Sequence, residues 1–306
     1  MNMVVSHWSA NLVVLVTYLV AAAAHLIGMS GAATSARRPG KPRPAVPAAE
    51  AVAFQLGLLV ALLALVSPLG YWSYRFVWVR NIQDVLLAFI APALIVLGAP
   101  WLPLARGLGL GGVLEWLGSG RAGSPAAGVA DSDRPRRWPM LPVVVTVLFS
   151  VGWWVWHLPG PFDSALGNPL IYAAEVVTYL GLGIMLWLQL VGSRPFSPRL
   201  EALRRIPLLF ATAAAGTALG LIRVFGPTLV YPAYLGFRHH TLSVVSDQQV
   251  GGAVLWMIPL VPLGVLAVAL CIRWLSDDEE SAGSAAGLDR LLEPRKSAWA
   301  ARPGLR

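Results

Sequence analysis

The stretch RFVWVRNIQDVLLAFIAPALIVLGAP, residues 75–100, decides the fold of this chain. It places Arg80, Gln83 and Asp84 at the start of a hydrophobic run, which then continues almost without a polar residue. A helix over residues 82–104 would be long enough to cross roughly 30 Å of hydrocarbon at about 1.5 Å per residue. The stretch therefore predicts a membrane-spanning helix with a charged pair at one end.

The composition is that of a membrane protein. Of the 306 residues, 57% are hydrophobic and 12% are charged, and the mean hydropathy is +0.65, whereas a soluble domain carries about 25% charged residues. Cys271 is the single cysteine, which excludes a disulfide framework and any paired-cysteine metal or redox motif. The six methionines are scattered, so the chain lacks a dedicated sulfur cage for Cu(I).

Apolar runs predict an all-α bundle with about seven transmembrane helices, which cover residues 8–28, 50–69, 82–104, 141–158, 170–191, 206–225 and 248–274. Pro92 predicts a kink in the third helix, because proline removes a backbone donor and clashes with the preceding turn. The segment PGPFDSALGNP after the fourth run is expected to be a short loop. We expect one membrane domain, residues 1–275. The remaining residues, 276–306, are expected to form a disordered cytoplasmic tail, either throughout or with a short surface helix around 287–292.

The basic residues indicate the orientation of the bundle. Of the 23 Lys and Arg, 19 lie in the loops after the first, third and fifth helices or at the C-terminal end. Because cytoplasmic loops are enriched in Lys and Arg, we expect the N-terminus outside and the C-terminus inside. The net charge of +8 then reflects orientation, and no nucleic-acid partner is expected.

This topology brings polar residues of several helices to one level at the outer end of the bundle. Arg80 and Asp84 are spaced i, i+4, so they share a helix face and can pair. Glu175 is expected to pair with Arg80 or Arg223. Charges inside a membrane span are costly unless paired or hydrated, so this layer is either a structural ion network or a functional pocket. The predicted outer site consists of Arg80, Gln83, Asp84, His157, Asp163, Tyr172, Glu175, Arg223, Asp247 and Gln248.

The histidines give little support for a haem. His157, beside interfacial tryptophans, is either a hydrogen-bonding residue or a ligand. His25 lies near the inner end of the first helix, across the bilayer from His157, so the two cannot share a metal or haem. His239 and His240 are adjacent in a loop, where we expect a solvated or interfacial role.

Four blocks of the sequence resemble a known family. They are SPLGYWSYRFVWVRNIQDVLLAFIAPALIVLGAP, WHLPGPFDSAL, NPLIYAAEVVTYLGLGIMLW and DQQVGGAVLWMIP, at residues 67–100, 156–166, 168–187 and 247–259. The chain resembles the caa3-type cytochrome c oxidase assembly factors (CtaG-like), polytopic bacterial membrane proteins linked to biogenesis of the oxidase copper centre. The resemblance implies a multi-pass protein of the bacterial inner membrane that is not an enzyme. Its implied partners are the lipid bilayer and oxidase subunits or a copper chaperone.

The chain departs from the family at four histidines. Where the family has His-x-x-Gln-His in the third helix, this chain has Arg80, Gln83 and Asp84. Where the fifth helix of the family has His-x-x-Glu-His, this chain has Tyr172, Glu175 and Val176. The glutamate is retained, and both histidines are replaced.

These changes weaken the assignment of copper as a cofactor. Arginine is permanently charged and cannot ligate a metal, and the imidazoles that suit copper are missing. The remaining candidate ligands are His157, Asp84 and Glu175. The resemblance supports an outer pocket through other residues that match the family, namely His157, Asp163, Asp247, Gln248 and Trp256.

Two functions from different classes follow. The first is a membrane-embedded accessory factor for cytochrome c oxidase biogenesis. The alternative is a transporter or permease with a charged outer vestibule, which the intramembrane charges favour and the lack of paired halves in the sequence opposes. A membrane enzyme or cytochrome has the least support, because no nucleophile motif, metal cage or haem pair is present in the sequence.

Overall fold

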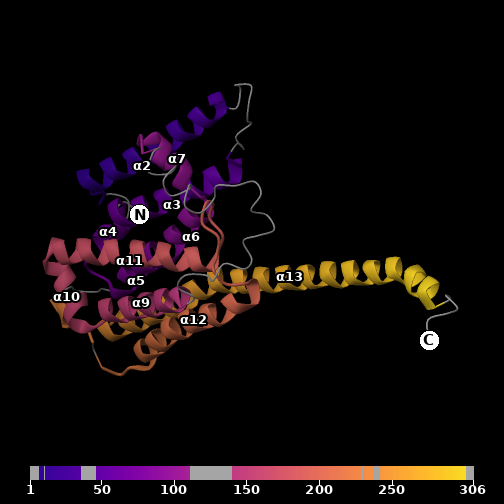
Figure 1. The fold of residues 1–306 in the computed structure, drawn as a ribbon. Coiled ribbons are helices and arrows are strands. Elements are labelled where there is room, and N and C mark those ends of the chain that lie inside the picture. The colour runs from indigo at the N-terminus through magenta and orange to yellow at the C-terminus, as the bar shows by residue number, and fades with distance from the viewer. Residues whose placement is uncertain are drawn as a thin grey trace.

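The hydrophobic runs form helices in the computed structural model (Figure 1), which describes residues 7–9, 11–35, 46–110, 140–228, 230–236 and 242–300. Within these residues, six helices are long and apolar enough to cross a membrane, and a bent pair makes a seventh span if counted as one. The all-α fold class with about seven spans is therefore confirmed. The charged loops that indicate orientation lie largely outside the described residues, so the placement of the termini stays a prediction.

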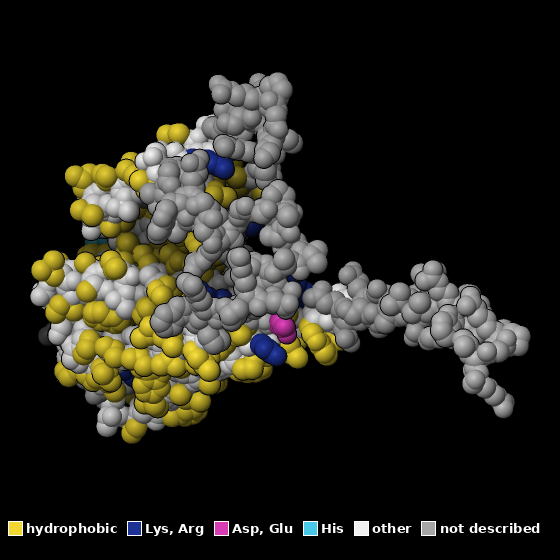
Figure 2. Space-filling model, viewed as in Figure 1, with side chains coloured by type: hydrophobic (Ala, Val, Ile, Leu, Met, Phe, Trp, Pro, Cys, Tyr) yellow, Lys and Arg dark blue, Asp and Glu magenta, His cyan; other side chains and the backbone are white. Residues whose placement is uncertain are grey.

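The long helices follow the expected order, and most boundaries differ by a few residues, whereas the last helix continues well beyond its predicted end at residue 274. They are α2 (Leu12–Ser35), α3 (Ala48–Val66), α9 (Leu141–Trp156), α11 (Pro169–Leu190), α12 (Ala202–Phe225) and α13 (Val244–Ala300), together with the central span described below. Many side chains on their outer faces are apolar and exposed, among them Val147, Phe210 and Val265. Figure 2 shows such side chains covering much of the visible surface, as expected for helices that face lipid.

The central span consists of three consecutive segments, α5 (Val77–Val85), the π-helical turn η1 (Leu86–Ile90) and α6 (Ala91–Leu97). Of its most apolar stretch, 78% is buried, against 17–39% for the other five long spans. The π turn lies immediately before Pro92, where sequence analysis predicts a kink. Because proline lacks an N–H and crowds the preceding turn, a widened turn accommodates it at this point.

The predicted ends of this span, at residues 82 and 104, were wrong. The helix begins at Val77, before the hydrophobic run, and ends at Leu97. Ala99 has a positive φ of 42° and precedes Pro100, which disfavours the helical conformation in the residue before it. A separate short helix, α7 (Trp101–Gly107), follows.

The prediction of a short loop after α9 was also wrong, because these residues form the helix α10 (Pro159–Gly167). Pro159 occupies the first turn, where its missing N–H costs nothing. Phe162 and Ala165 are three residues apart and both buried, so one face of α10 packs on the bundle. The axis bends by 67° between α9 and α10.

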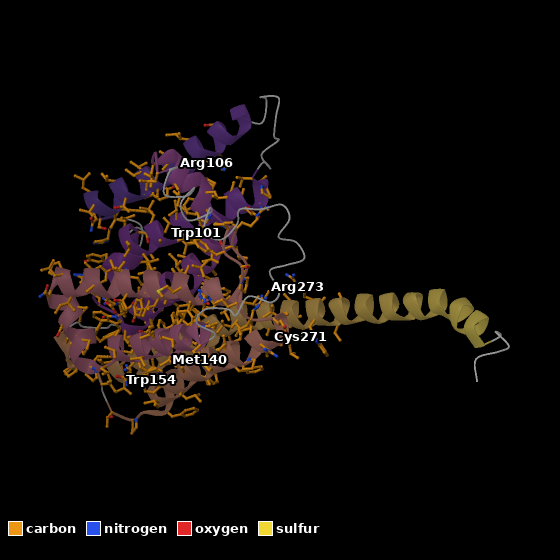
Figure 3. All side chains as sticks on the ribbon, in the orientation of Figure 1. Trp101, Arg106, Met140, Trp154, Cys271 and Arg273 are labelled. Carbon is orange, nitrogen blue, oxygen red and sulfur yellow. The ribbon has the colours of Figure 1, made fainter. Side chains whose placement is uncertain are left out.

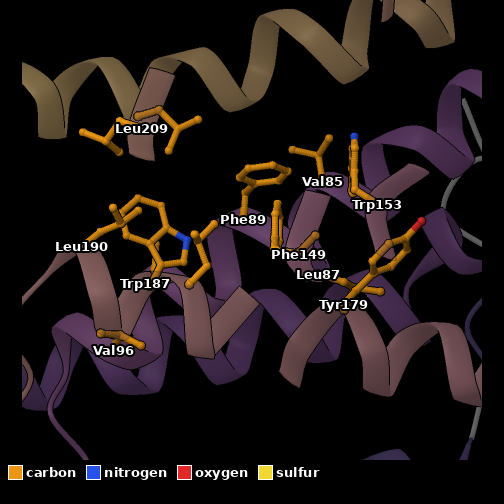
Figure 4. Close-up of a cluster of buried hydrophobic side chains, with 14 of the residues drawn as sticks. Val85, Leu87, Phe89, Val96, Phe149, Trp153, Tyr179, Trp187, Leu190 and Leu209 are labelled. Atoms are coloured by element: carbon orange, nitrogen blue, oxygen red, sulfur yellow. The ribbon is translucent and has the colours of Figure 1, made fainter. Parts of the chain in front are cut away.

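Large aromatic side chains fill the core around the central span. Figure 4 shows Phe89 beside Phe149 and Trp153 of α9, in a cluster that includes Tyr179 and Trp187 of α11. Phe89 meets Phe149 and Trp153 edge to face at centroid distances of 5.0 and 5.2 Å, a geometry that aromatic rings favour. The core therefore joins α9 and α11 to the central span.

Helices α12 and α13 pack closely through glycine. A Cβ atom on Gly220 would lie 2.7 Å from the carbonyl oxygen of Gly252, so only hydrogen fits there, and the small residue allows the two helices to approach closely. Helix α13 leaves the bundle near Cys271 and Arg273 (Figure 3) and continues to Ala300. The boundary between a membrane domain, 1–275, and a tail, 276–306, stays a prediction, although the helix crosses it.

Candidate functional site

Arg80 lies at the centre of the predicted outer site. Its guanidinium is fully buried, forms an ion pair with Glu175 of α11, and has its Nε atom 3.4 Å from Oδ1 of Asp84. Of the two partners expected for Glu175, the structure thus selects Arg80. Since Asp84 is one turn further along the same helix, one arginine holds two buried carboxylates.

His157, which follows α9, faces the same cluster. Its Nε2 atom lies 3.7 Å from Oδ2 of Asp84, and its Nδ1 atom lies 2.7 Å from the carbonyl oxygen of Trp153. A carbonyl oxygen only accepts, so this geometry assigns the ring hydrogen to Nδ1 and leaves a lone pair on Nε2 toward Asp84. Neither Nε2 nor that Oδ2 has a hydrogen-bond partner within the described residues. Two buried polar atoms of Asp84 and His157 therefore face each other beyond hydrogen-bond distance.

Arg223 of α12 anchors the turn between α9 and α10. Its guanidinium donates to the carbonyl oxygen of His157 and lies 4.2 Å from the ring centroid of Tyr231. The hydroxyl of Tyr231 donates to the same carbonyl oxygen at 2.9 Å. Burial raises the pKa of Tyr231, so its hydroxyl stays protonated and able to donate.

Asp247 explains why the central span begins before its hydrophobic run. Its carboxylate accepts from the backbone N–H groups of Val77 at 2.9 Å and Trp78 at 3.1 Å. Both donors belong to the first turn of α5, which has no side-chain cap of its own, so a carboxylate 170 residues away caps it.

Gln83 and Gln248 each bridge two segments. Gln83 donates from Nε2 to the carbonyl oxygen of Ala64 at 2.7 Å and to the hydroxyl oxygen of Tyr172 at 2.8 Å, which joins α3 to α11. Gln248 holds the segment after α12, because its side chain bonds to the backbone of Thr228 and Val230.

Asp163 belongs to the hydrogen bonds around the charged cluster and not to the ion pairs of Arg80. It accepts from the backbone N–H of Ala233 in the short helix η2 (Pro232–Gly236) at 3.4 Å, and thereby links α10 to η2. The ten predicted residues therefore form one charged cluster around Arg80 and a surrounding set of hydrogen bonds that fix the ends of the helices.

Aromatic side chains surround the cluster, and two of them, Phe162 and Tyr179, were not among the predicted site residues, whereas Tyr172 was. The rings of Tyr172 and Phe162 lie 5.0 and 5.5 Å from the guanidinium of Arg80, within the range of cation–π attraction. Tyr179 places its hydroxyl 3.4 Å from Nδ1 of His157. Tyr179 is four residues after Glu175, a spacing that shares a helix face and could have identified it.

The residues of this cluster do not fit a copper ion. Both carboxylates are engaged by Arg80, and the described part of the chain holds no group of three or more His, Cys, Asp or Glu placed to bind a metal. His25 is on α2, where Nδ1 lies 3.3 Å from Nε2 of Gln55. His239 and His240 lie outside the described residues.

Comparison with known proteins places this geometry in a family context. A model of the family described as cytochrome c oxidase caa3 assembly factor matches residues 26–277. An uncharacterized protein of Mycobacterium leprae is 24% identical over 252 residues, which cover 77% of this chain and 36% of that protein. Uncharacterized proteins of Mycobacterium bovis and Mycobacterium tuberculosis are each 24% identical over 208 residues, which cover 67% of this chain and 31% of theirs. The chain thus spans about a third of the length of these curated relatives. No solved structure matches it.

Proposed function

The chain belongs to the cytochrome c oxidase caa3 assembly factor family, and from this premise we propose that it is a non-catalytic assembly factor of the bacterial inner membrane. The observation that carries the proposal is the family match over residues 26–277, which includes the whole central span and every helix of the charged cluster. Its partners are the oxidase subunits or a copper chaperone that meets them in the membrane.

The charged cluster has a structural role in this proposal. Arg80 on α5 holds Asp84 on its own helix and Glu175 on α11, and Asp84 in turn faces His157 at the end of α9. Removing one member of such a buried network leaves an unpaired charge, which is strongly destabilising. The cluster therefore fixes three helices at one end, and the surface that these helices present to the oxidase depends on it.

Burial also distinguishes this role from a transporter vestibule. The side chains of Arg80, Asp84, Glu175 and Arg223 are 0–4% exposed. A vestibule presents its charges to water, whereas these are enclosed by aromatic rings and by one another. The burial of these charges therefore favours the assembly role over a transporter.

Deleting the gene and measuring assembled haem–copper oxidase tests the proposal. We expect lower oxidase content in the reduced-minus-oxidised spectrum and lower oxidase activity, most clearly in limiting copper. The wild-type gene and an Arg204→Gln variant, altered at an exposed residue, should restore both. Unchanged oxidase content and activity in limiting copper would refute the assembly role.

A further inference from the structure

A groove separates the N-terminal helices from α11. It has a volume of about 1130 Å³ and is lined by residues of α2, α3, α4 (Pro68–Trp72) and α11. Figure 2 shows the corresponding hollow between α2 and α11 in the space-filling view. The volume exceeds the roughly 300–1,000 Å³ of pockets for small molecules. The groove suits a longer and more apolar occupant.

The length of the groove matches one leaflet of a bilayer. On α11 its lining runs from Pro169 to Ile184, about 22 Å at 1.5 Å per residue. One leaflet with its headgroup region is roughly 20–22 Å thick, half of the full bilayer. A transmembrane helix of a partner would run along both leaflets, whereas a lipid fills one.

The polar groups of the groove gather at one end. Tyr71, Tyr74 and Tyr172 lie there with the segment before α2, while Leu58, Leu62, Val176 and Leu180 are among the side chains that line the rest. Thr17 and Tyr18, nearly two turns beyond Asn11 along α2, are the polar exceptions. This distribution is that of an amphiphile, with a headgroup level and a chain level.

Positive charge lies next to the headgroup end, on Arg75, which contacts the groove residue Tyr71 without lining the groove itself. The guanidinium of Arg75 bonds to the hydroxyl of Tyr71 and lies 4.3 Å from the centroid of its ring. No Asp or Glu is among the described residues that line the groove. Arginine pairs well with phosphate oxygens, so the charge at this end complements an anionic headgroup.

We propose that this groove holds one anionic phospholipid of the leaflet at the Arg80 end, with its phosphate beside Arg75 and its acyl chains along α11. Tyr172 connects this lipid site to the charged cluster, because its ring lines the groove while its hydroxyl accepts from Gln83. A lipid seated against Tyr172 would pack on a residue that contacts the buried network. The inference stands apart from the assembly role, since it concerns binding only.

Native mass spectrometry of the full chain tests the proposal. The purified protein is equilibrated with equal amounts of phosphatidylglycerol and phosphatidylcholine that carry identical acyl chains. We expect one retained phosphatidylglycerol per chain, preferred about fivefold, the factor expected for one basic residue facing an anionic headgroup. Arg75→Gln should abolish the preference, whereas Arg204→Gln, at an exposed arginine outside the groove, should keep it.

A matched pair of variants separates the groove from the rest of the lipid-facing surface. Ala173 and Ala174 are adjacent and exposed on α11, but only Ala173 lines the groove. Ala173→Trp fills the groove and should reduce retention of phosphatidylglycerol, whereas Ala174→Trp should not. Equal retention of the two lipids, or equal effects of the two tryptophans, would mean general annular lipid and would overturn the proposal. Circular dichroism of each variant shows that it is folded.

Discussion

The central span and α2 are both apolar helices, but the protein uses them in opposite ways. The most apolar 18-residue stretch of the span Val77–Leu97 has a mean hydropathy of 1.6, and 78% of it is buried; the corresponding stretch of Leu12–Ser30 has a mean hydropathy of 2.2, and 17% of it is buried. The more apolar helix thus faces outward, and the helix that carries Arg80 and Asp84 lies inside. In a membrane the outer surface must suit lipid, while charges are tolerated where other side chains pair with them.

The largest expected effect in this comparison comes from Arg80. Arg80→Ala leaves Asp84 and Glu175 buried without their counter-charge, so we expect a loss of about 3–5 kcal/mol of stability. Thermal unfolding of the purified protein in detergent measures it. Arg204→Ala, which removes an exposed arginine, is the control and should change little. A stable Arg80→Ala protein would show that the cluster does not hold the bundle.

The next largest effect is expected when a leucine is replaced in the central span, compared with the same substitution on α2. Leu87 in the central span is 1% exposed, and Leu19 on α2 is 61% exposed. Leu87→Ala should cost about 2–5 kcal/mol because it creates a cavity, whereas Leu19→Ala should stay within about 0.5 kcal/mol. Chemical unfolding in mixed micelles gives both values. Similar losses at the two sites would contradict the assignment of inside and outside.

A smaller effect is expected at the start of the central span. Asp247→Ala removes the acceptor of two backbone N–H groups in the first turn of α5, and loss of a helix cap costs about 0.5–2 kcal/mol. Asp247→Asn keeps one oxygen acceptor and should recover part of the loss. Hydrogen exchange at Val77 and Trp78 locates the effect. Unchanged protection there in Asp247→Ala would exclude the capping role.

The smallest expected effect is the change that added copper causes in the unfolding temperature of the native protein. A ligand that binds the folded state stabilises it by about 2.7 kcal/mol at a concentration of 100 times its Kd, so copper bound at the charged cluster would raise the unfolding temperature. We expect no shift for the native protein. A variant with the four family histidines restored, Arg80→His, Asp84→His, Tyr172→His and Val176→His, should gain copper affinity. Equally tight binding by the native protein would contradict our argument from the missing histidines.

Sequence patterns predicted the helices and part of the site, because both depend on local spacing. The i, i+4 spacing of Arg80 and Asp84 is sufficient to place them together. The start of α5 was missed because its cap, Asp247, lies 170 residues away from Val77. The helix α10 was missed because its prolines and glycines suggest a loop, while its burial depends on tertiary packing.

The partner of Glu175 could not be chosen from sequence for a similar reason. Arg80 and Arg223 are both expected at the same depth, and helix periodicity does not say which neighbour α11 faces. The structure gives Glu175 to Arg80 and directs Arg223 to the carbonyl oxygen of His157. Packing of α11 against the central span decides between the two.

A double-mutant cycle on Arg80 and Glu175 tests most directly whether the buried ion pairs hold the helices together. Stability is measured for Arg80→Met, Glu175→Gln and the double variant by unfolding in detergent. We predict that the double variant loses less stability than the two single losses combined, with a coupling energy of about 0.5–3 kcal/mol, because it leaves one fewer unpaired charge than Arg80→Met. Losses that add within about 0.5 kcal/mol would contradict the account.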